Sequence, residues 1–136
     1  MNLLNDMSFQ RLQAGLQAAN IRQRTIANNV ANVDTPYYKS SSVSFEDMLQ
    51  QQMDDSNMRT LRGVTTDPRH FAIGPNSSIP DPVITTDQST AMNNNMNNVD
   101  VDKEMSNLAQ NQLRYNAYIQ QVNEQIKMMK VAVGGN

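Results

Sequence analysis

Apolar residues recur at alternating intervals of three and four at both ends of this chain, and that heptad pattern most constrains its fold. One series runs from residue 9 to 33 and the other from residue 101 to 133. This spacing is typical of helices that bury one apolar stripe. It predicts a helix over about residues 6–32 and a second that begins near residue 100. The residues expected to pack are Phe9, Leu12, Leu16, Ala19, Ile26, Val30, Met105, Leu108, Tyr115, Ile119, Val122, Ile126 and Met129.

The ends of the C-terminal helix are marked in the sequence. Asp100 can serve as its N-cap, and Asp102 and Glu104 lie in the first turn, where the helix dipole favours anions. Gly134 and Gly135 can end it. Two long striped helices at opposite ends of one chain predict a hairpin in which stripe packs against stripe.

Each stripe is interrupted by one glutamine, Gln23 in the first and Gln112 in the second. A buried polar residue can fix the register of a coiled coil. The sequence therefore suggests the hypothesis that these two side chains face each other across the hairpin.

The middle of the chain has no heptads and holds all five prolines. The segment Ser44–Asp47 resembles a capping box, followed by a short helix. Residues 59–64 and 70–73 are candidates for short strands, but the prolines argue against a regular central sheet. The Asn-rich stretch 91–98 is expected to be mobile until bound. The one face of the short helix would carry Phe45, Met48, Leu49 and Met53.

The expected fold is mainly α, with long N- and C-terminal amphipathic helices that pair as a coiled-coil-like hairpin. The irregular middle segment contains a short helix and short strands. The corresponding divisions are an N-terminal helix within residues 1–33, a loop-rich segment at 34–99 and a C-terminal helix within residues 100–136.

Composition excludes several classes of function. Apolar residues make up 38% of the chain, Cys and Trp are absent, and 18 Asn and 13 Gln give it many amide side chains, so an isolated core would be thin. A net charge of −2 does not suit a general nucleic-acid or anionic-membrane binder. A single His and three Glu leave few groups for acid–base catalysis. We therefore predict no enzyme, no catalytic residue, no cofactor, no metal ligand and no small-molecule substrate; no cleaved signal peptide or membrane span is visible either.

The most specific string, residues 28–39, lies where the first helix must end, because Thr35 precedes Pro36 and is biased away from helix. This string resembles the N-terminal signature of flagellar basal-body rod and hook proteins. Tyr37 stands where Gly or Asn is more usual, and a bulky residue there resists a positive φ. The matching residues are Asn29, Ala31, Asn32, Thr35, Pro36, Tyr38 and Lys39.

Further segments match one member of this family more closely, namely residues 66–71, 97–100, 104–105 and 111–115. The resemblance implies a structural subunit without enzymatic activity, whose terminal helices pack with other rod proteins and copies of itself into the inner tube of the rod that serves motility. It also implies export by the flagellar type III apparatus without a cleaved signal. The implied partners are the basal-body protein FliE, the MS ring and the export gate.

A lone hairpin of two striped helices leaves apolar surface in water. The monomer is therefore expected to be partly disordered at its ends and to order on assembly. The alternative is a closed coiled-coil adaptor or secretion chaperone. A closed dimer would saturate at a fixed mass, whereas a rod subunit associates without closing.

Overall fold

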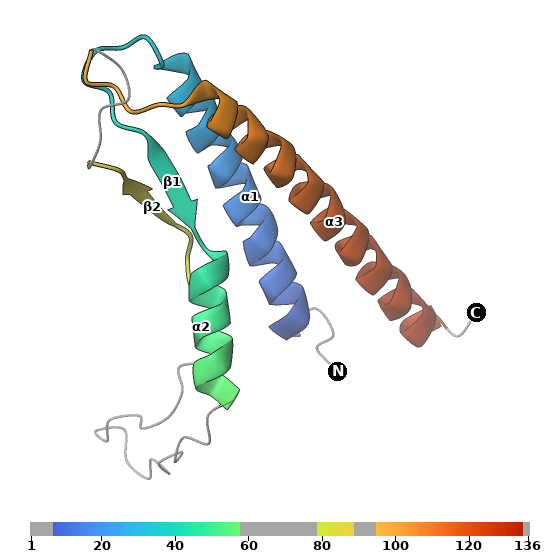
Figure 1. The fold of residues 1–136 in the computed structure, drawn as a ribbon. Coiled ribbons are helices and arrows are strands. Elements are labelled where there is room, and N and C mark those ends of the chain that lie inside the picture. Colours follow the sequence, from blue (N-terminus) through green and yellow to red (C-terminus); the bar gives the residue numbers. More distant parts are fainter. Residues whose placement is uncertain (1–6, 58–78, 89–94, 135–136) are drawn as a thin grey trace.

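The computed structural model describes residues 7–57, 79–88 and 95–134, and two long helices dominate it. Helix α1 (Met7–Ala31) and helix α3 (Val101–Gly134) lie side by side and antiparallel (Figure 1). The predicted hairpin of terminal helices is therefore confirmed. None of the described helices is long and apolar enough to cross a membrane.

Small residues on α1 let the two helices approach closely. Gly15 lies against the ring of Tyr118, and a β-carbon built on that glycine would stand only 2.9 Å from the ring atom Cζ. Ala18 and Ala19 are also buried. Seven residues before Gly15, Ser8 accepts a hydrogen bond from the Gln125 side chain. The contacts thus repeat at heptad spacing along an antiparallel pair.

The hypothesis that Gln23 and Gln112 face each other is wrong, because both side chains are exposed. A different amide occupies the seam. Asn111 is buried between the helices, and its Nδ2 donates a hydrogen bond to the backbone oxygen of Ala19 at 2.9 Å. The physical reason is that the apolar stripe of α3 is wider than the contact, and α1 packs against one edge of it.

The expected packing residues accordingly differ in exposure. Those at the edge of the α3 stripe away from α1 are the more exposed, with Met105 at 51%. Ala19 and Ile26 are buried; Phe9, Leu12, Leu16, Val30, Leu108, Tyr115, Val122 and Met129 are partly buried; and Met105, Ile119 and Ile126 are exposed.

The predicted short helix is present as α2 (Glu46–Asn57), but its start differs from the expectation. Ser44 is the last residue of a strand, and the backbone N–H of Leu49 bonds to the carbonyl oxygen of Phe45 at 2.9 Å. Phe45, not Ser44, is therefore the N-cap residue, and its ring is buried. Met48 and Leu49 are partly buried, whereas Met53 is exposed.

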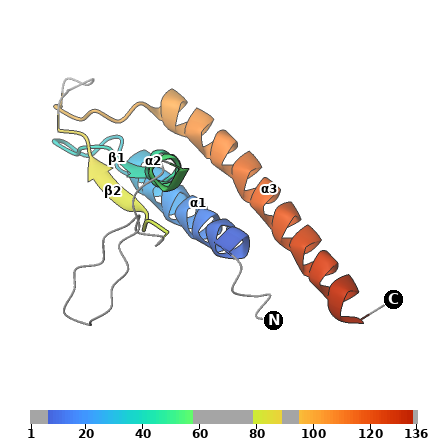
Figure 2. The ribbon, with the colours of Figure 1, turned by 90° about the horizontal axis from the view of Figure 1, so that it is seen from below.

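Two short strands complete the described fold. Strand β1 (Ser41–Ser44) pairs antiparallel with β2 (Val83–Thr86), with Ser41 opposite Thr86. Strand β1 packs against α1, and α2 continues from it (Figure 1). The expected strands at 59–64 and 70–73, His70 and residues 66–71 lie outside the described residues, as do residues 91–94 of the Asn-rich stretch. Figure 2 shows the same arrangement from below, with α3 on the far side of α1 from β2.

Candidate functional site: an asparagine junction beside a polar groove

Three asparagines hold together the end of the molecule where α1 stops, β1 begins and α3 starts. Asn29 and Asn97 are each 0% exposed, and Asn98 is also buried. Buried amides are costly unless they are hydrogen-bonded. The bonds that these side chains make therefore define this end of the fold, which we call the asparagine junction.

Asn29 joins α1 to the start of β1. Its Nδ2 donates to the backbone oxygen of Ser41 at 2.8 Å, and its Oδ1 accepts from the backbone N–H of Ser41 at 3.0 Å. The hydroxyl of Tyr38 donates to the same Oδ1 at 3.2 Å. The amide thus acts as an extra pairing partner for the strand residue. Asn29 also hydrogen-bonds Glu104 at the start of α3.

Asn97 joins the approach to α3 to the exit of α1. Its Nδ2 donates to the backbone oxygens of Asn32 at 2.8 Å and Thr35 at 2.9 Å. Its Oδ1 accepts from the backbone N–H of Val99 at 2.7 Å. A single side chain therefore ties the approach to α3 to two carbonyls of the turn after α1, which also accept the backbone N–H groups of Thr35 and Tyr38.

Asn98 makes the third connection. Its Oδ1 accepts from the backbone N–H of Ser40 at 2.6 Å, and its Nδ2 donates to the backbone oxygen of Asp87 at 2.9 Å. Asn97 and Asn98 come from a segment that matches the family by sequence, but their partners in the turn between α1 and β1 are about sixty residues away. The sequence string alone indicates nothing about these distant hydrogen bonds, so the predicted site residues do not include Asn97 and Asn98.

The signature residues build the turn between α1 and β1. The Asn32 side chain donates to the backbone oxygen of Asn28 at 2.7 Å and accepts from the Thr35 hydroxyl at 3.2 Å. Ala31 and Pro36 are exposed, and Lys39 is partly buried. The structure thus brings Asn29, Asn32, Thr35 and Tyr38 into one hydrogen-bonded unit and leaves Ala31 and Pro36 at its surface.

Tyr37 adopts the left-handed conformation, with a φ of 63°. Its ring is 76% exposed, and its backbone N–H donates to the oxygen of Asn95 at 3.0 Å. Met96 on the facing loop is also left-handed, with a φ of 64°. Two bulky residues in this region are uncommon. The tyrosine therefore adopts a backbone conformation that Gly or Asn adopts at lower cost.

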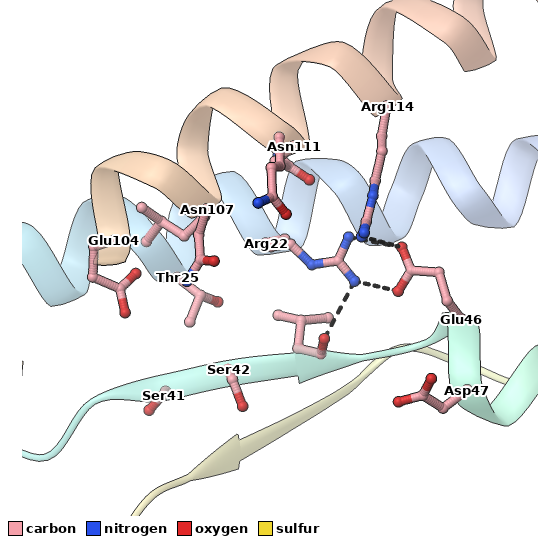
Figure 3. Close-up of a pocket in the computed structure, with 13 residues that line it drawn as sticks. Arg22, Thr25, Ser41, Ser42, Glu46, Asp47, Glu104, Asn107, Asn111 and Arg114 are labelled. Atoms are coloured by element: carbon pink, nitrogen blue, oxygen red, sulfur yellow. Dashed lines mark hydrogen bonds and ion pairs between the residues drawn. The ribbon is translucent and has the colours of Figure 1, made fainter. Parts of the chain in front are cut away.

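Next to the junction, a groove of about 350 Å³ opens between β1 and α3. Its floor is α1, one wall is β1 with the first turn of α2, and the other wall is α3 (Figure 3). We call it the β1–α3 groove. Its principal polar lining residues are Arg22, Thr25, Glu46, Asp47, Glu104 and Asn111.

A charge cluster closes one end of the groove. Arg22 forms a bidentate ion pair with Glu46, with Nη1 at 2.8 Å from Oε1, and also donates to the backbone oxygen of Val43 at 3.3 Å. Arg114 on α3 reaches the same carboxylate at 3.3 Å. Burial alone would raise the pKa of Glu46, but the hydrogen bond from Arg22 and the two arginine charges hold that pKa below the ordinary 4.5.

The other end of the groove contains Glu104. Burial raises the pKa of this carboxyl above the ordinary 4.5, although the hydrogen bond with Asn29 and the charge of Lys103 oppose the shift. Among the residues that the structure describes, no group of three or more His, Asp or Glu side chains could hold a metal ion. The described lining of the groove therefore offers hydrogen-bonding groups and charged groups.

Comparison with known proteins identifies what the chain resembles. Residues 9–39 match the family model described as flagella basal body rod protein. The chain is 39% identical to the flagellar basal body rod protein FlgB of Bacillus subtilis, over 94% of each chain. It is 33% identical to FlgB of Proteus mirabilis, over 93% of this chain and 92% of the other, and 31% identical to FlgB of Salmonella typhimurium, over 96% and 94%.

Proposed function

The chain belongs to the FlgB family of flagellar basal body rod proteins, and from this premise we propose that it polymerises through α1 and α3 with neighbouring rod subunits. As a member of that family it is a structural component of the rod, located in the flagellar basal body, and not an enzyme. The resemblance expected from the sequence is thereby confirmed. The adaptor and chaperone alternative has no support in these comparisons.

One observation carries the proposal about the helices. Along α3, three apolar side chains next to the α1 contact remain exposed: Met105 at 51%, Ile119 at 37% and Ile126 at 36%. Residues 105, 119 and 126 are spaced by multiples of seven and so lie in one row. We call this row the α3 strip. An apolar row beside a helix seam is suited to a further helix.

Association with other rod proteins follows from membership of the rod. The finer partners are part of the proposal: copies of this chain, the basal-body protein FliE, the MS ring and the export gate. Export by the flagellar type III apparatus belongs to the same proposal. Support for these partners comes from the family alone.

The test is a charge placed in the α3 strip. Ile119→Asp should leave the hairpin folded, because Ile119 is already exposed in the single chain. In an assembled rod the same carboxylate would be buried without a partner, at a cost of several kcal/mol. We expect a strain with this variant as its only copy to stop swimming, and its purified basal bodies to lack the protein.

The matched control is Ala117→Asp, which places the same charge on an exposed position of α3 away from the strip. Helix content by circular dichroism should equal that of the parent in both variants. Normal swimming with Ile119→Asp and with Ile126→Asp would contradict polymerisation through this strip.

A further inference from the structure

The β1–α3 groove contains more hydrogen-bond acceptors than its own donors satisfy. Asn111 is only 2% exposed, and while its Nδ2 bonds to Ala19, its Oδ1 meets no donor within the part of the chain that the structure describes. An unsatisfied buried oxygen normally costs about 1–3 kcal/mol. Asn111 reaches the groove from α3 (Figure 3).

The charges of the groove point the same way. Its lining has three carboxylates, Glu46, Asp47 and Glu104, against two arginines, Arg22 and Arg114. Both arginines already contact Glu46. The surplus is therefore one negative charge together with the free Asn111 oxygen. An occupant that supplies N–H donors and positive charge would complement the groove.

Helix α1 carries such a set of donors on its other side. Gln13, Gln17, Asn20 and Arg24 are all exposed and follow a spacing of four, three and four. At about 100° per residue they form one row, on the side of the helix opposite Arg22 in the floor of the groove. We call this row the amide stripe.

We propose that the β1–α3 groove of one copy of this chain receives the amide stripe of a second copy. This inference rests on the proposed function and specifies one of its contacts. A groove of about 350 Å³ admits side chains but not a whole helix, which is about 10 Å across. The second α1 therefore lies over the groove and inserts its amides and Arg24 towards Asp47, Glu104 and the Asn111 oxygen.

The geometry also explains why such a contact continues from copy to copy. The groove and the amide stripe lie on opposite sides of α1, so each copy uses two different surfaces. A contact of this kind is heterologous and repeats around a ring or helix, whereas a self-complementary patch would stop at a dimer. A tubular rod needs the first kind.

Cysteine cross-linking tests the pairing directly, because the chain has no cysteine of its own. Asn20→Cys places a thiol in the amide stripe, and Asn107→Cys places one in the lining of the groove. In basal bodies isolated from a strain whose only copy carries both changes, mild oxidation should give disulfide-linked dimers and larger ladders. Each single-cysteine strain should give only monomers under the same conditions.

The remaining outcomes are decisive as well. A double-cysteine protein present in basal bodies without cross-links would overturn the contact between the groove and the amide stripe, and would leave the proposed rod function intact. Dimers from Asn20→Cys alone would also overturn it, because they require a symmetric contact. Absence of the unaltered chain from isolated rods would instead refute the proposed function.

If the cysteine substitutions prevent incorporation of the chain into basal bodies, a second test exchanges the charges of two residues across the proposed contact. Arg24→Glu should lower the amount of the chain in basal bodies at least about tenfold, since it adds a negative charge opposite an acidic groove. Adding Asp47→Arg should restore most of that loss. Full incorporation of Arg24→Glu, or no recovery in the double variant, would overturn the contact.

Discussion

Replacing Tyr37 tests whether its left-handed backbone is strained. A residue with a β-carbon pays about 1–2 kcal/mol for this conformation, while glycine pays about 0.5–1 kcal/mol more in unfolded-chain entropy. At a φ of 63° the balance favours glycine. We expect Tyr37→Gly to be more stable than Tyr37→Ala by about 0.5–1 kcal/mol, or about 2–4 °C in Tm.

The comparison of Gly with Ala removes the ring in both variants, so the difference reports the backbone alone. Urea unfolding followed by circular dichroism at 222 nm measures it. Asp34 provides the matched site, because it is exposed in the same turn and has no positive φ. There Ala should be more stable than Gly. A Tyr37→Ala protein as stable as Tyr37→Gly would refute the argument.

Three further predictions concern stability. Asn29→Ala should lose about 2–4 kcal/mol, because it leaves the N–H and C=O of the first β1 residue buried and unpaired, whereas Asn32→Ala should lose under about 1 kcal/mol; equal losses in urea unfolding would count against this. The pKa of Glu46 is lowered in the folded chain, so its ion pairs stabilise the fold at neutral pH and this stability is lost as the pH falls below 4.5. Glu46→Gln should therefore flatten stability against pH in that acid range, and an unchanged slope would contradict the assignment. Gly15→Ala should destabilise the hairpin because of the 2.9 Å approach of the Tyr118 ring, but should add about 1 kcal/mol in a Tyr118→Ala background; a gain in both backgrounds would show that the ring yields freely.

The terminal helices could be predicted closely from the sequence. Heptad spacing is a local signal that extends over several turns, and it gave a helix over about residues 6–32 where the structure has Met7–Ala31. The cap signals placed the start of the second helix near Asp100, and it begins at Val101. The specific string also pointed to Asn29, which the structure places among hydrogen-bonded residues at the end of α1.

The strands and the helix register could not be predicted in the same way. Strand β1 is the sequence Ser-Ser-Val-Ser, and β2 follows Pro82 directly, so neither shows the alternation of a strand with one buried face. The roles of Asn97 and Asn98 depend on partners far away in the sequence. The heptad spacing of apolar residues predicts the width of the α3 stripe, but it does not predict which edge of that stripe packs against α1.

Because α1 packs against only one edge of the apolar stripe of α3, different residues of α3 stabilise the hairpin and remain available for contact with another subunit. Where α1 meets α3, the buried contacts include a glycine under Tyr118 and Asn111 bonded to a backbone oxygen. Such contacts fix register and distance through small and polar groups, whereas buried apolar area contributes about 25 cal/mol per Å² to association. The larger aliphatic side chains of the α3 strip, such as Ile119 and Ile126, remain exposed. In the proposed rod, another subunit covers the strip and buries its apolar side chains, so association there adds hydrophobic free energy that the single chain does not gain.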